Sequence, residues 1–351
     1  MENLAHLRVA PPPSVRPQWN APEGARAPAP VVSVVTPAWN AAETLAQTIA
    51  SVAAQTWRDF EMIVVDDGST DHTPIVLAQQ ARRYRWLSWC SQANAGAAGA
   101  RETGIALSRG EFIAFLDADD LWAPNKLALQ IAAFERNPDA AFVYTDMRDF
   151  HPDRDRRRTL FQIKKPARGH VLRALFERGN FILTSTAMVR KSALRDVNGF
   201  NPKLLINEDV DLWFRLAERH EFDFIPEVLV RRRLLAGSLM HSNTLKVWQS
   251  DLDLIDRWVQ RRPDLFPPDS PWVRRRRALT WSRLANTYLH QCAFAESRHA
   301  FVQAMRYGRF DPRTLAHGVA ACAPPTAYLY WNTKAAWRRV LHHGGAATQR
   351  V

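Results

Sequence analysis

The sequence predicts an α/β protein with a mostly parallel β-sheet flanked by helices and a helical C-terminal extension. Two patterns carry this prediction. Short β-branched apolar runs alternate with amphipathic segments from residue 31 to about residue 150, as in successive βαβ units. From about residue 240 onward the apolar residues recur at helical spacing. The stretch between them, residues 168–230, has a mixed α and β pattern.

The first half of the chain yields the individual elements in order. Its predicted strands lie within residues 31–40, 60–70, 86–92, 111–120 and 140–147. Its predicted helices lie within residues 40–55, from Asp71 and Pro74 onward, and within residues 94–110 and 123–137. For the first helix we expect Asn40 as the N-cap, with Glu43 three residues later.

The expected domain organisation has three parts. Residues 1–30 contain seven prolines without periodicity, which is typical of a disordered or extended lead-in. Residues 31–240 form the α/β domain, and residues 241–351 form a helical region. No apolar run follows Met1, so no signal peptide is expected, and no apolar stretch is long enough to span a bilayer.

The net charge of +12 comes mainly from arginine, which is clustered at residues 154–158, 231–233 and 274–277. A basic surface attracts nucleic acid, anionic lipid or phosphorylated substrates. The clusters lack interleaved aromatic residues and match no nucleic-acid module, so we expect no nucleic-acid partner. A solvated or membrane-facing surface and a phosphate-contacting role both stay open.

Three aspartates, Asp117, Asp119 and Asp120, directly follow the apolar run of the fourth predicted strand. Carboxylates this close together repel one another unless a positive charge lies between them. Mg²⁺ and Mn²⁺ prefer oxygen ligands and commonly use one or two carboxylates together with substrate phosphates. If the strand continues, alternate residues such as Asp117 and Asp119 share a face. The pattern therefore predicts a metal site, with helix capping by Asp119 or Asp120 as the alternative.

Five motifs, taken together and in order, resemble those of the family 2 glycosyltransferases. Each motif alone is weakly specific, but the ordered set spans about 190 residues. The resemblance implies the nucleotide-sugar-binding GT-A fold. The motifs are SVVTPAWN (33–40), IVVDDGSTD (63–71), NAGAAGARETG (94–104), GEFIAFLDADD (110–120) and NGFNPKLLINEDVDLWFRLA (198–217).

The resemblance assigns one set of residues to the donor nucleotide. A carboxylate such as that of Asp67 can accept a hydrogen bond from a base N–H or a ribose hydroxyl. Arg101 has a structural ion pair as an equally open role, and Glu102 stands where the family often has Asn. The residues assigned to the donor are Thr36, Pro37, Asp67, Asn94, Gly96, Arg101 and Asp117.

Glu208 and Asp209 begin a predicted helix with Val210, Trp213 and Leu216 on its apolar face. Acidic residues are favourable at any helix N-terminus, so simple capping is an alternative. The resemblance implies instead that this pair supplies the catalytic base. We expect Asp209 to be the base and Glu208 to orient it or to contact the acceptor.

The resemblance implies an inverting, hexosyltransferase-type enzyme that uses a nucleotide-diphospho sugar with Mg²⁺ or Mn²⁺. The expected acceptor is a glycan or a lipid-linked glycan, in cell-envelope or extracellular polysaccharide synthesis. No Q-x-x-R-W motif of the processive synthases occurs, which favours transfer of one or a few sugars. The expected location is cytoplasmic, and peripheral contact with the inner face of the plasma membrane stays open.

His241 lies beyond the acidic pair, where some relatives of the family place a His that contacts the metal or a phosphate, and a surface-loop His is the alternative. Arg233 is a candidate contact of the leaving diphosphate. A nucleotidyltransferase would usually carry a Gly-rich phosphate loop with a basic residue after the first strand, and TPAWNAAET has neither. A catalytically degenerate nucleotide-sugar binder or scaffold is the other alternative, and the intact acidic pairs argue against it.

Overall fold

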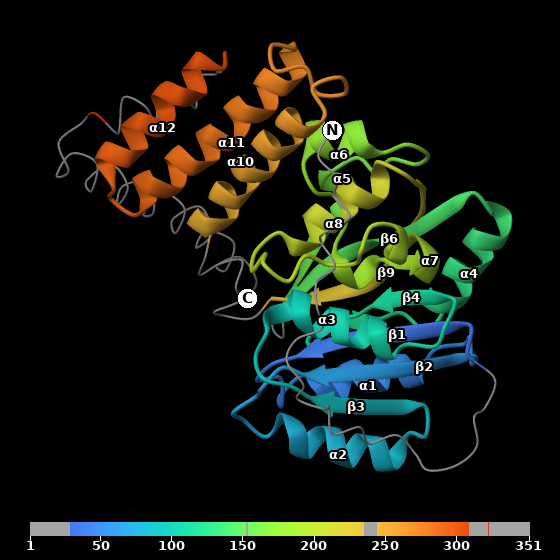
Figure 1. The fold of residues 1–351 in the computed structure, drawn as a ribbon. Helices are drawn as coiled ribbons and strands as arrows, with labels where there is room; N and C mark the ends of the chain where they lie inside the picture. Colours follow the sequence, from blue (N-terminus) through green and yellow to red (C-terminus); the bar gives the residue numbers. More distant parts are fainter. Residues whose placement is uncertain (1–28, 152–153, 235–243, 309–321, 323–351) are drawn as a thin grey trace, which may run out of the picture. The chain divides into compact units, whose positions relative to one another are not determined.

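A computed structural model of the chain describes residues 29–151, 154–234, 244–308 and 322 (Figure 1). The chain divides into two compact units, Met1–Ala236 and Gly237–Val351. This division lies close to the boundary expected at residue 240. Most of the proline-rich lead-in, the residues after 308 other than 322, and His241 lie outside the described residues.

The first unit contains a nine-stranded sheet in the order β3-β2-β1-β4-β8-β6-β9-β5, with β7 pairing to β6. The helices lie on both sides of the strands (Figure 1). The strands are β1 (Val32–Ala38), β2 (Phe60–Asp66), β3 (Leu87–Ser91), β4 (Phe112–Phe115), β5 (Leu121–Trp122), β6 (Ala140–His151), β7 (Arg154–Thr159), β8 (Met188–Arg190) and β9 (Glu221–Arg233).

All five strands predicted in the first half are present, and β3, β2, β1 and β4 pair in parallel, as expected. The long pairing of β6 with β9 is also parallel. The antiparallel pairings involve the short strands β8 and β5 and the arginine-rich β7. The sheet is therefore mostly parallel, as expected, and in such sheets ligands bind at the carboxyl ends of the parallel strands.

Four of the predicted helices also form. The helices of the first unit are α1 (Leu45–Ala53), α2 (Thr73–Arg83), α3 (Gly96–Leu107), α4 (Lys126–Arg136), α5 (Leu160–Ile163), α6 (Leu172–Arg178), α7 (Lys191–Asp196) and α8 (Glu208–Ala217), with the 3₁₀ helix η2 at Thr184–Thr186.

The sheet has an apolar core on each face. On one face, side chains of α1, α2 and α4 pack against the strands in the largest apolar cluster. On the other face, Ala100 of α3 packs beside the β2 and β3 side chains. Trp213 of α8 lies against Phe115 and Phe142, with ring centroids 6.2 and 4.7 Å away. Helices α3 and α8 are thereby fixed over the strands that precede the acidic residues.

The prediction that Asn40 caps α1 is wrong. Helix α1 begins five residues later, after Thr44, and Asn40 has a left-handed backbone with φ of 49°. The Asn40 side-chain oxygen accepts a hydrogen bond from the Thr70 backbone N–H at 2.8 Å. Asparagine tolerates this conformation better than most residues. Asn40 thus joins the end of β1 to the loop after β2 instead of starting a helix.

The second unit contains α10 (Thr244–Arg261), α11 (Pro271–His290) and α12 (Phe294–Arg306). Helices α11 and α12 form the hairpin expected from the sequence, with a shared apolar cluster that includes Ala285 and Phe301. Helices α10 and α11 are joined by a buried ion pair between Arg276 and Asp251, described below in the Discussion.

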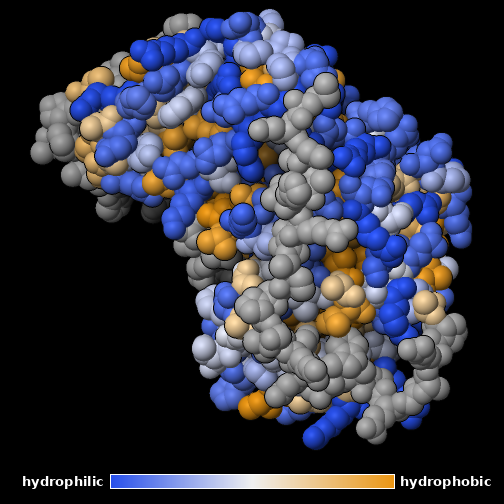
Figure 2. Space-filling view, in the orientation of Figure 1, coloured by the Kyte–Doolittle hydropathy of each residue, from blue (hydrophilic) through white to orange (hydrophobic). Residues whose placement is uncertain are grey.

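Hydrophilic residues predominate on the visible face of the molecule, and apolar residues form small separate groups (Figure 2). No helix among the described residues is long and apolar enough to cross a membrane. A few large apolar side chains are nevertheless exposed, and Leu205 is the most exposed of those in the described residues. They are Trp39, Ile75, Ile163, Leu205, Leu265 and Val302.

Candidate active site

The three aspartates after β4 lie in a turn and not in a continuing strand. Strand β4 ends at Phe115, and the Asp120 backbone N–H donates to the Asp117 carbonyl at 3.1 Å. The expectation that strand alternation places Asp117 and Asp119 on one face is therefore wrong. The hydroxyls of Thr44 and Thr48 both donate to the Ala118 carbonyl, each at 2.9 Å. The N-terminal end of helix α1 thus anchors the backbone of the aspartate turn.

Asp120 is an anchor of this turn. Its carboxylate accepts hydrogen bonds from the Ser185 hydroxyl at 2.6 Å and from the Arg233 backbone N–H at 3.1 Å. The same Ser185 hydroxyl accepts from the Asp117 N–H at 3.1 Å. The Asp120 residue is only 1% exposed. With both of its oxygens bonded to protein donors, Asp120 is less available to a metal than Asp117 or Asp119.

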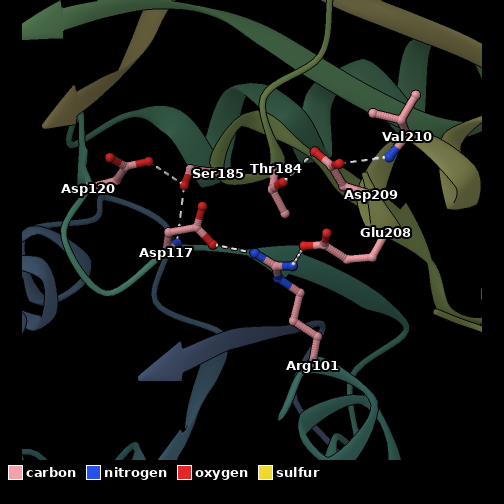
Figure 3. A network of polar contacts seen from close by, with 8 residues as sticks. All are labelled: Arg101, Asp117, Asp120, Thr184, Ser185, Glu208, Asp209 and Val210. Atoms are coloured by element: carbon pink, nitrogen blue, oxygen red, sulfur yellow. Dashed lines mark hydrogen bonds and ion pairs between the residues drawn. The ribbon is translucent and has the colours of Figure 1, made fainter. Parts of the chain in front are cut away.

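Arg101 of α3 lies between the aspartate turn and the start of α8 (Figure 3). Its guanidinium donates to Asp117 at 2.7 Å and to Glu208 at 2.8 Å. Burial opposes the charged guanidinium, but the two carboxylates raise the pKa of Arg101 above its ordinary value. The sequence left open whether Arg101 binds the donor or forms a structural ion pair, and here it forms two ion pairs.

Asp209 occupies the first turn of α8, as expected. Its carboxylate accepts from the Thr184 hydroxyl at 3.0 Å and from the Val210 backbone N–H at 2.7 Å (Figure 3). Burial, reinforced by the neighbouring charge of Glu208, raises the pKa of Asp209 to about 7. A carboxyl group with this pKa can both accept and release a proton near neutral pH.

Asp117 and Asp119 form the more accessible part of the acidic cluster. Burial and the charge of Asp117 raise the pKa of Asp119 to about 6. The pKa of Asp120 lies well above its ordinary value because of burial and the two neighbouring aspartates. Part of each shift comes from repulsion between the neighbouring carboxylates, which a bound divalent cation would relieve.

The residues present fit such a cation only in part. Among the described residues, no group of three or more His, Cys, Asp or Glu side chains is arranged to hold a metal ion. This is consistent with the sites in which Mg²⁺ takes one or two carboxylates and completes its shell with water and substrate phosphates. Asp119 is the strongest candidate ligand. Asp117 would have to share its carboxylate with Arg101.

Most of the residues assigned to the donor lie at the carboxyl ends of β1 and β2 and at the start of α3, whereas Arg101 lies in the middle of α3 and Asp117 follows β4. Asp67 follows β2, and its carboxylate accepts from the Gln92 side chain at 2.8 Å and the Ala95 N–H at 2.9 Å. The Asn94 side chain donates to the Asp67 carbonyl at 3.0 Å. Asp67 therefore shapes the loop that leads into Gly96 and α3.

Thr36 and Pro37 belong to the last part of β1. Thr36 is fully buried, and its hydroxyl has no hydrogen-bond partner among the described residues. Pro37 is half-buried, and Trp39, two residues later, is 56% exposed. An exposed indole at this edge of the sheet is a large flat surface that the sequence interpretation did not include among the donor contacts.

Arg233 contacts the backbone of the aspartate turn. The sequence suggested this residue as a diphosphate contact. Its guanidinium donates to the Asp119 carbonyl at 3.0 Å and to the Gln47 side chain at 2.7 Å. The side chain is thus adjacent to the candidate metal residues. His241, the other suggested contact, lies outside the described residues.

Sequence reasoning missed two hydroxyl residues that connect the site. Thr184 and Ser185 form η2, and they bind Asp209 and Asp120 respectively. The signal was the consecutive hydroxyl residues at 184–186, which directly follow an apolar stretch. Such a run at a buried position needs acceptors, and the strand-end acids were the available ones.

Residues 33–197 match the protein family described as "Glycosyl transferase family 2". The acidic pair at residues 208–209 lies just beyond the matched segment. "UDP-Glc:alpha-D-GlcNAc-diphosphoundecaprenol beta-1,3-glucosyltransferase WfgD" of Escherichia coli is 41% identical over 115 residues, covering 32% of this chain and 44% of WfgD. "Amylovoran biosynthesis glycosyltransferase AmsB" of Erwinia amylovora is 30% identical over 201 residues, covering 55% of this chain and 65% of AmsB. The chain thus spans less than two thirds of the length of these curated relatives.

A solved structure with the same fold is the mannosyltransferase PcManGT from Pyrobaculum calidifontis, in complex with GDP-Man and Mn²⁺. The match has a TM-score of 0.57 at 18% identity and covers 95% of this chain and 91% of the other. At this identity the similarity establishes the shared GT-A fold.

Proposed function

The chain contains a family 2 glycosyltransferase domain, and on this premise we propose that it transfers a sugar from a nucleotide-diphospho sugar to an acceptor hydroxyl with inversion at the anomeric carbon. The observation that carries the proposal is the bridge formed by Arg101, which joins Asp117 on the donor side to Glu208 beside Asp209. Asp117 on the donor side and Glu208, the neighbour of the candidate base, are thereby held on either side of one buried cation.

Asp209 is the proposed general base. Inversion needs one carboxylate that accepts the acceptor proton while the hydroxyl oxygen attacks and the nucleoside diphosphate leaves. The Thr184 hydroxyl and the Val210 N–H fix the carboxylate orientation. Glu208 raises the proton affinity of Asp209 by its charge, while its own carboxylate is bound to Arg101. Glu208 therefore acts as an orienting and electrostatic partner.

We assign the divalent cation, Mg²⁺ or Mn²⁺, to Asp119, with Asp117 as a second ligand. When bound, it supplies positive charge that stabilises the diphosphate leaving group. Asp120 keeps the turn in shape through Ser185 and the Arg233 N–H. Arg233 is close enough to the turn to add positive charge near the diphosphate.

For the donor nucleotide we retain Thr36, Pro37, Asp67, Asn94 and Gly96. They lie at the carboxyl ends of β1 and β2 and the start of α3, the edge at which ligands bind in α/β sheets. The exposed Trp39 ring, at the same edge, supplies a surface on which a nucleobase can stack.

The acceptor class is proposed from the relatives. WfgD is named for transfer from UDP-Glc to a GlcNAc-diphosphoundecaprenol, and AmsB for amylovoran biosynthesis. A lipid-linked or growing envelope glycan is therefore our proposed acceptor. Such an acceptor would bring the protein to the inner face of the membrane, where its net charge of +12 favours anionic lipid.

The proposal is tested in two steps with the full chain. A thermal-shift screen of UDP- and GDP-sugars with Mn²⁺ identifies the donor, because a bound donor raises the melting temperature according to its occupancy. Transfer from that donor to a GlcNAc-α-diphosphate bearing an undecyl chain is then measured by mass spectrometry. Donor binding without turnover on this acceptor or on a panel of simple glycosides would favour the degenerate-binder alternative.

A further inference from the structure

Residues 201–207 connect the buried Phe200 to the start of α8, and both ends of this loop are held by adjacent residues of α3. At the first end, the Glu102 carboxylate accepts from the Phe200 backbone N–H at 2.5 Å. At the second end, Arg101 donates to Glu208 at 2.8 Å. The same helix that carries the donor-side Arg101 therefore fixes where this loop leaves the core and where it returns.

The first attachment is tightly packed. A side chain at Gly199, which has φ of 59°, would place its Cβ only 2.2 Å from Glu102 Oε1. Arg215 of α8 donates to the Val197 and Gly199 carbonyls at 2.6 and 2.7 Å. The Phe200 ring is 2% exposed and has the Arg101 guanidinium 5.4 Å from its centroid. Glu102 thus completes a close fit that leaves little freedom at residue 200.

The tip of the loop carries an unusual surface residue. Leu205 is 79% exposed, more than any other large apolar side chain among the described residues. Its Cδ2 is only 3.5 Å from the position that a Cβ on Gly96 would occupy, so it lies against the start of α3. Leu205 therefore stands beside the donor edge of the site, four residues before the proposed base Asp209.

We propose that residues 201–207 form the acceptor-contacting loop, that Leu205 packs against the apolar C–H face of an acceptor pyranose, and that Glu102 is the positioning residue of the loop. This inference rests on the proposed function. The acceptor hydroxyl must reach Asp209, so the body of the acceptor lies near the loop that leads into α8 and carries Leu205. A sugar ring presents an apolar face there, and an exposed leucine gains stability by covering it.

This role of Glu102 also explains why the chain has a glutamate at a position where the family often has asparagine. From its position on α3, the Glu102 carboxylate reaches the Phe200 N–H. Burial in this contact raises the pKa of Glu102 above its ordinary value. The placement of the loop, and with it the choice of acceptor, is thereby tied to the residue next to Arg101.

The contact role is tested with Leu205→Ser and the matched control Leu265→Ser, since Leu265 is a leucine of the helical unit that is 42% exposed. The assay uses the donor found in the screen and GlcNAc-α-diphosphate-undecyl as acceptor. Leu205→Ser should raise the acceptor KM about fivefold to tenfold, the effect of one partly covered apolar side chain. Donor affinity by calorimetry should stay at the wild-type value. An unchanged acceptor KM overturns the contact role.

The positioning role is tested with Glu102→Ala and Glu102→Gln. The alanine variant should raise the acceptor KM more than it lowers kcat and should speed hydrogen exchange at the Phe200 amide. The glutamine variant keeps an oxygen that can accept this bond and should restore both readouts. Equal effects of the two substitutions, or unchanged exchange in Glu102→Ala, overturn this role. If the wild type neither binds nor glycosylates the acceptor probe, the proposed function and the contact role fail together, while the exchange measurement still decides whether Glu102 anchors the loop.

Discussion

Among the residues that the structure describes, Arg101 of the first unit and Arg276 of the helical unit are both buried and paired with carboxylate, but the two arginines have different surroundings. In the helical unit, Arg276 of α11 donates to Asp251 of α10 at 2.5 Å and to the Thr280 hydroxyl at 2.8 Å. The Thr280 hydroxyl donates in turn to Asp251 at 2.9 Å. One cation, one anion and one hydroxyl form a closed triangle that joins two helices.

The surroundings of Arg101 are unbalanced by comparison. Arg101 is bound to two carboxylates, Asp117 and Glu208, and further carboxyl groups with raised pKa values lie next to each of them. A purely structural ion pair gains nothing from such an excess of acid. We therefore propose that the triangle around Arg276 serves stability, and that the cluster around Arg101 takes up a cation and a proton during the proposed reaction.

The largest expected effect is on catalysis. Asp209→Asn keeps the shape of the side chain but removes the proton acceptor, so we expect the transfer rate to fall by ~10²- to 10⁴-fold. Donor affinity should change little, because the donor contacts lie on β1, β2 and α3. Steady-state transfer and calorimetric donor binding measure the two effects.

Glu208→Gln is the matched variant for this measurement. It should lower the rate less than Asp209→Asn, because Glu208 orients and does not accept the proton. A wild-type rate in Asp209→Asn, or a complete loss of transfer in Glu208→Gln alone, would show that the two roles are reversed.

The next effect separates the two arginines directly. Arg276→Met leaves the buried Asp251 without its cation, and we expect a loss of roughly 3–5 kcal/mol in unfolding free energy. Turnover per folded molecule should be retained. Arg101→Met should do the reverse and mainly reduce transfer, since Asp117 keeps partial contact with water, its side chain being 30% exposed. Urea unfolding and transfer assays on both variants decide, and equal behaviour of the two variants would contradict the comparison.

The metal assignment predicts a smaller change in stability. Donor and Mn²⁺ at about 100 times their dissociation constant should stabilise the folded protein by ~2.7 kcal/mol in a thermal-shift experiment. Asp119→Ala should remove the part of this gain that depends on Mn²⁺. Asp264→Ala, which changes an exposed acid of the helical unit, should keep it. Full Mn²⁺ dependence in Asp119→Ala would exclude Asp119 as a ligand.

The pKa of Asp209 sets the expected pH dependence. Because its folded-state pKa is raised to about 7, the base is protonated and inactive at low pH and becomes ionised as the pH rises through 7. We expect kcat/KM to increase roughly tenfold between pH 6 and pH 8 and then to level off. The residual activity of Asp209→Asn should show no inflection in this range. A wild-type kcat/KM that does not change between pH 6 and pH 8 would show that Asp209 is not the group whose ionisation limits the reaction.

The smallest expected effect concerns the membrane. If exposed arginines of α11 contact anionic lipid, each contributes roughly 1 kcal/mol and is screened by salt. The full chain should bind phosphatidylglycerol vesicles at low salt and dissociate as salt is raised. Arg275→Ala should weaken this binding more than Arg85→Ala, a change of an exposed arginine in the first unit. Binding that ignores salt, or none at low salt, would contradict the proposal.

The elements of the fold could be predicted where local pattern and packing agree. Strands β1, β2, β4 and β6 each contain a short apolar run, and helices α1 to α4 each follow a strand in an alternating pattern. Strands β5, β7 and β8 could not be predicted, because they are short or charged and depend on pairing partners far along the chain. The N-cap at Asn40 failed for a similar reason, since its true partner, Thr70, is thirty residues away.

The site shows the same division. The acids could be predicted because Asp117, Asp119, Glu208 and Asp209 stand at element ends, within motifs that occur in a specific order along the chain. Their connections could not, because the Arg101 bridge spans 107 residues to Glu208. No local pattern distinguishes an arginine that binds a donor from one that joins two carboxylates until the fold brings its partners together.

The two hydrogen bonds from Thr44 and Thr48 to the Ala118 carbonyl limit which segments of the protein can be exchanged. These hydroxyls touch no proposed ligand, yet they fix the backbone at the centre of the aspartate turn. The 201–207 loop, by contrast, is held beside α3 by the Glu102 contact with Phe200 and the Arg101 contact with Glu208. A chimaera that exchanges this loop for that of a relative should therefore use a different acceptor sugar and keep its affinity for the donor. A chimaera that exchanges α1 would have to carry both threonines with it, although neither would stand out in a screen for binding residues.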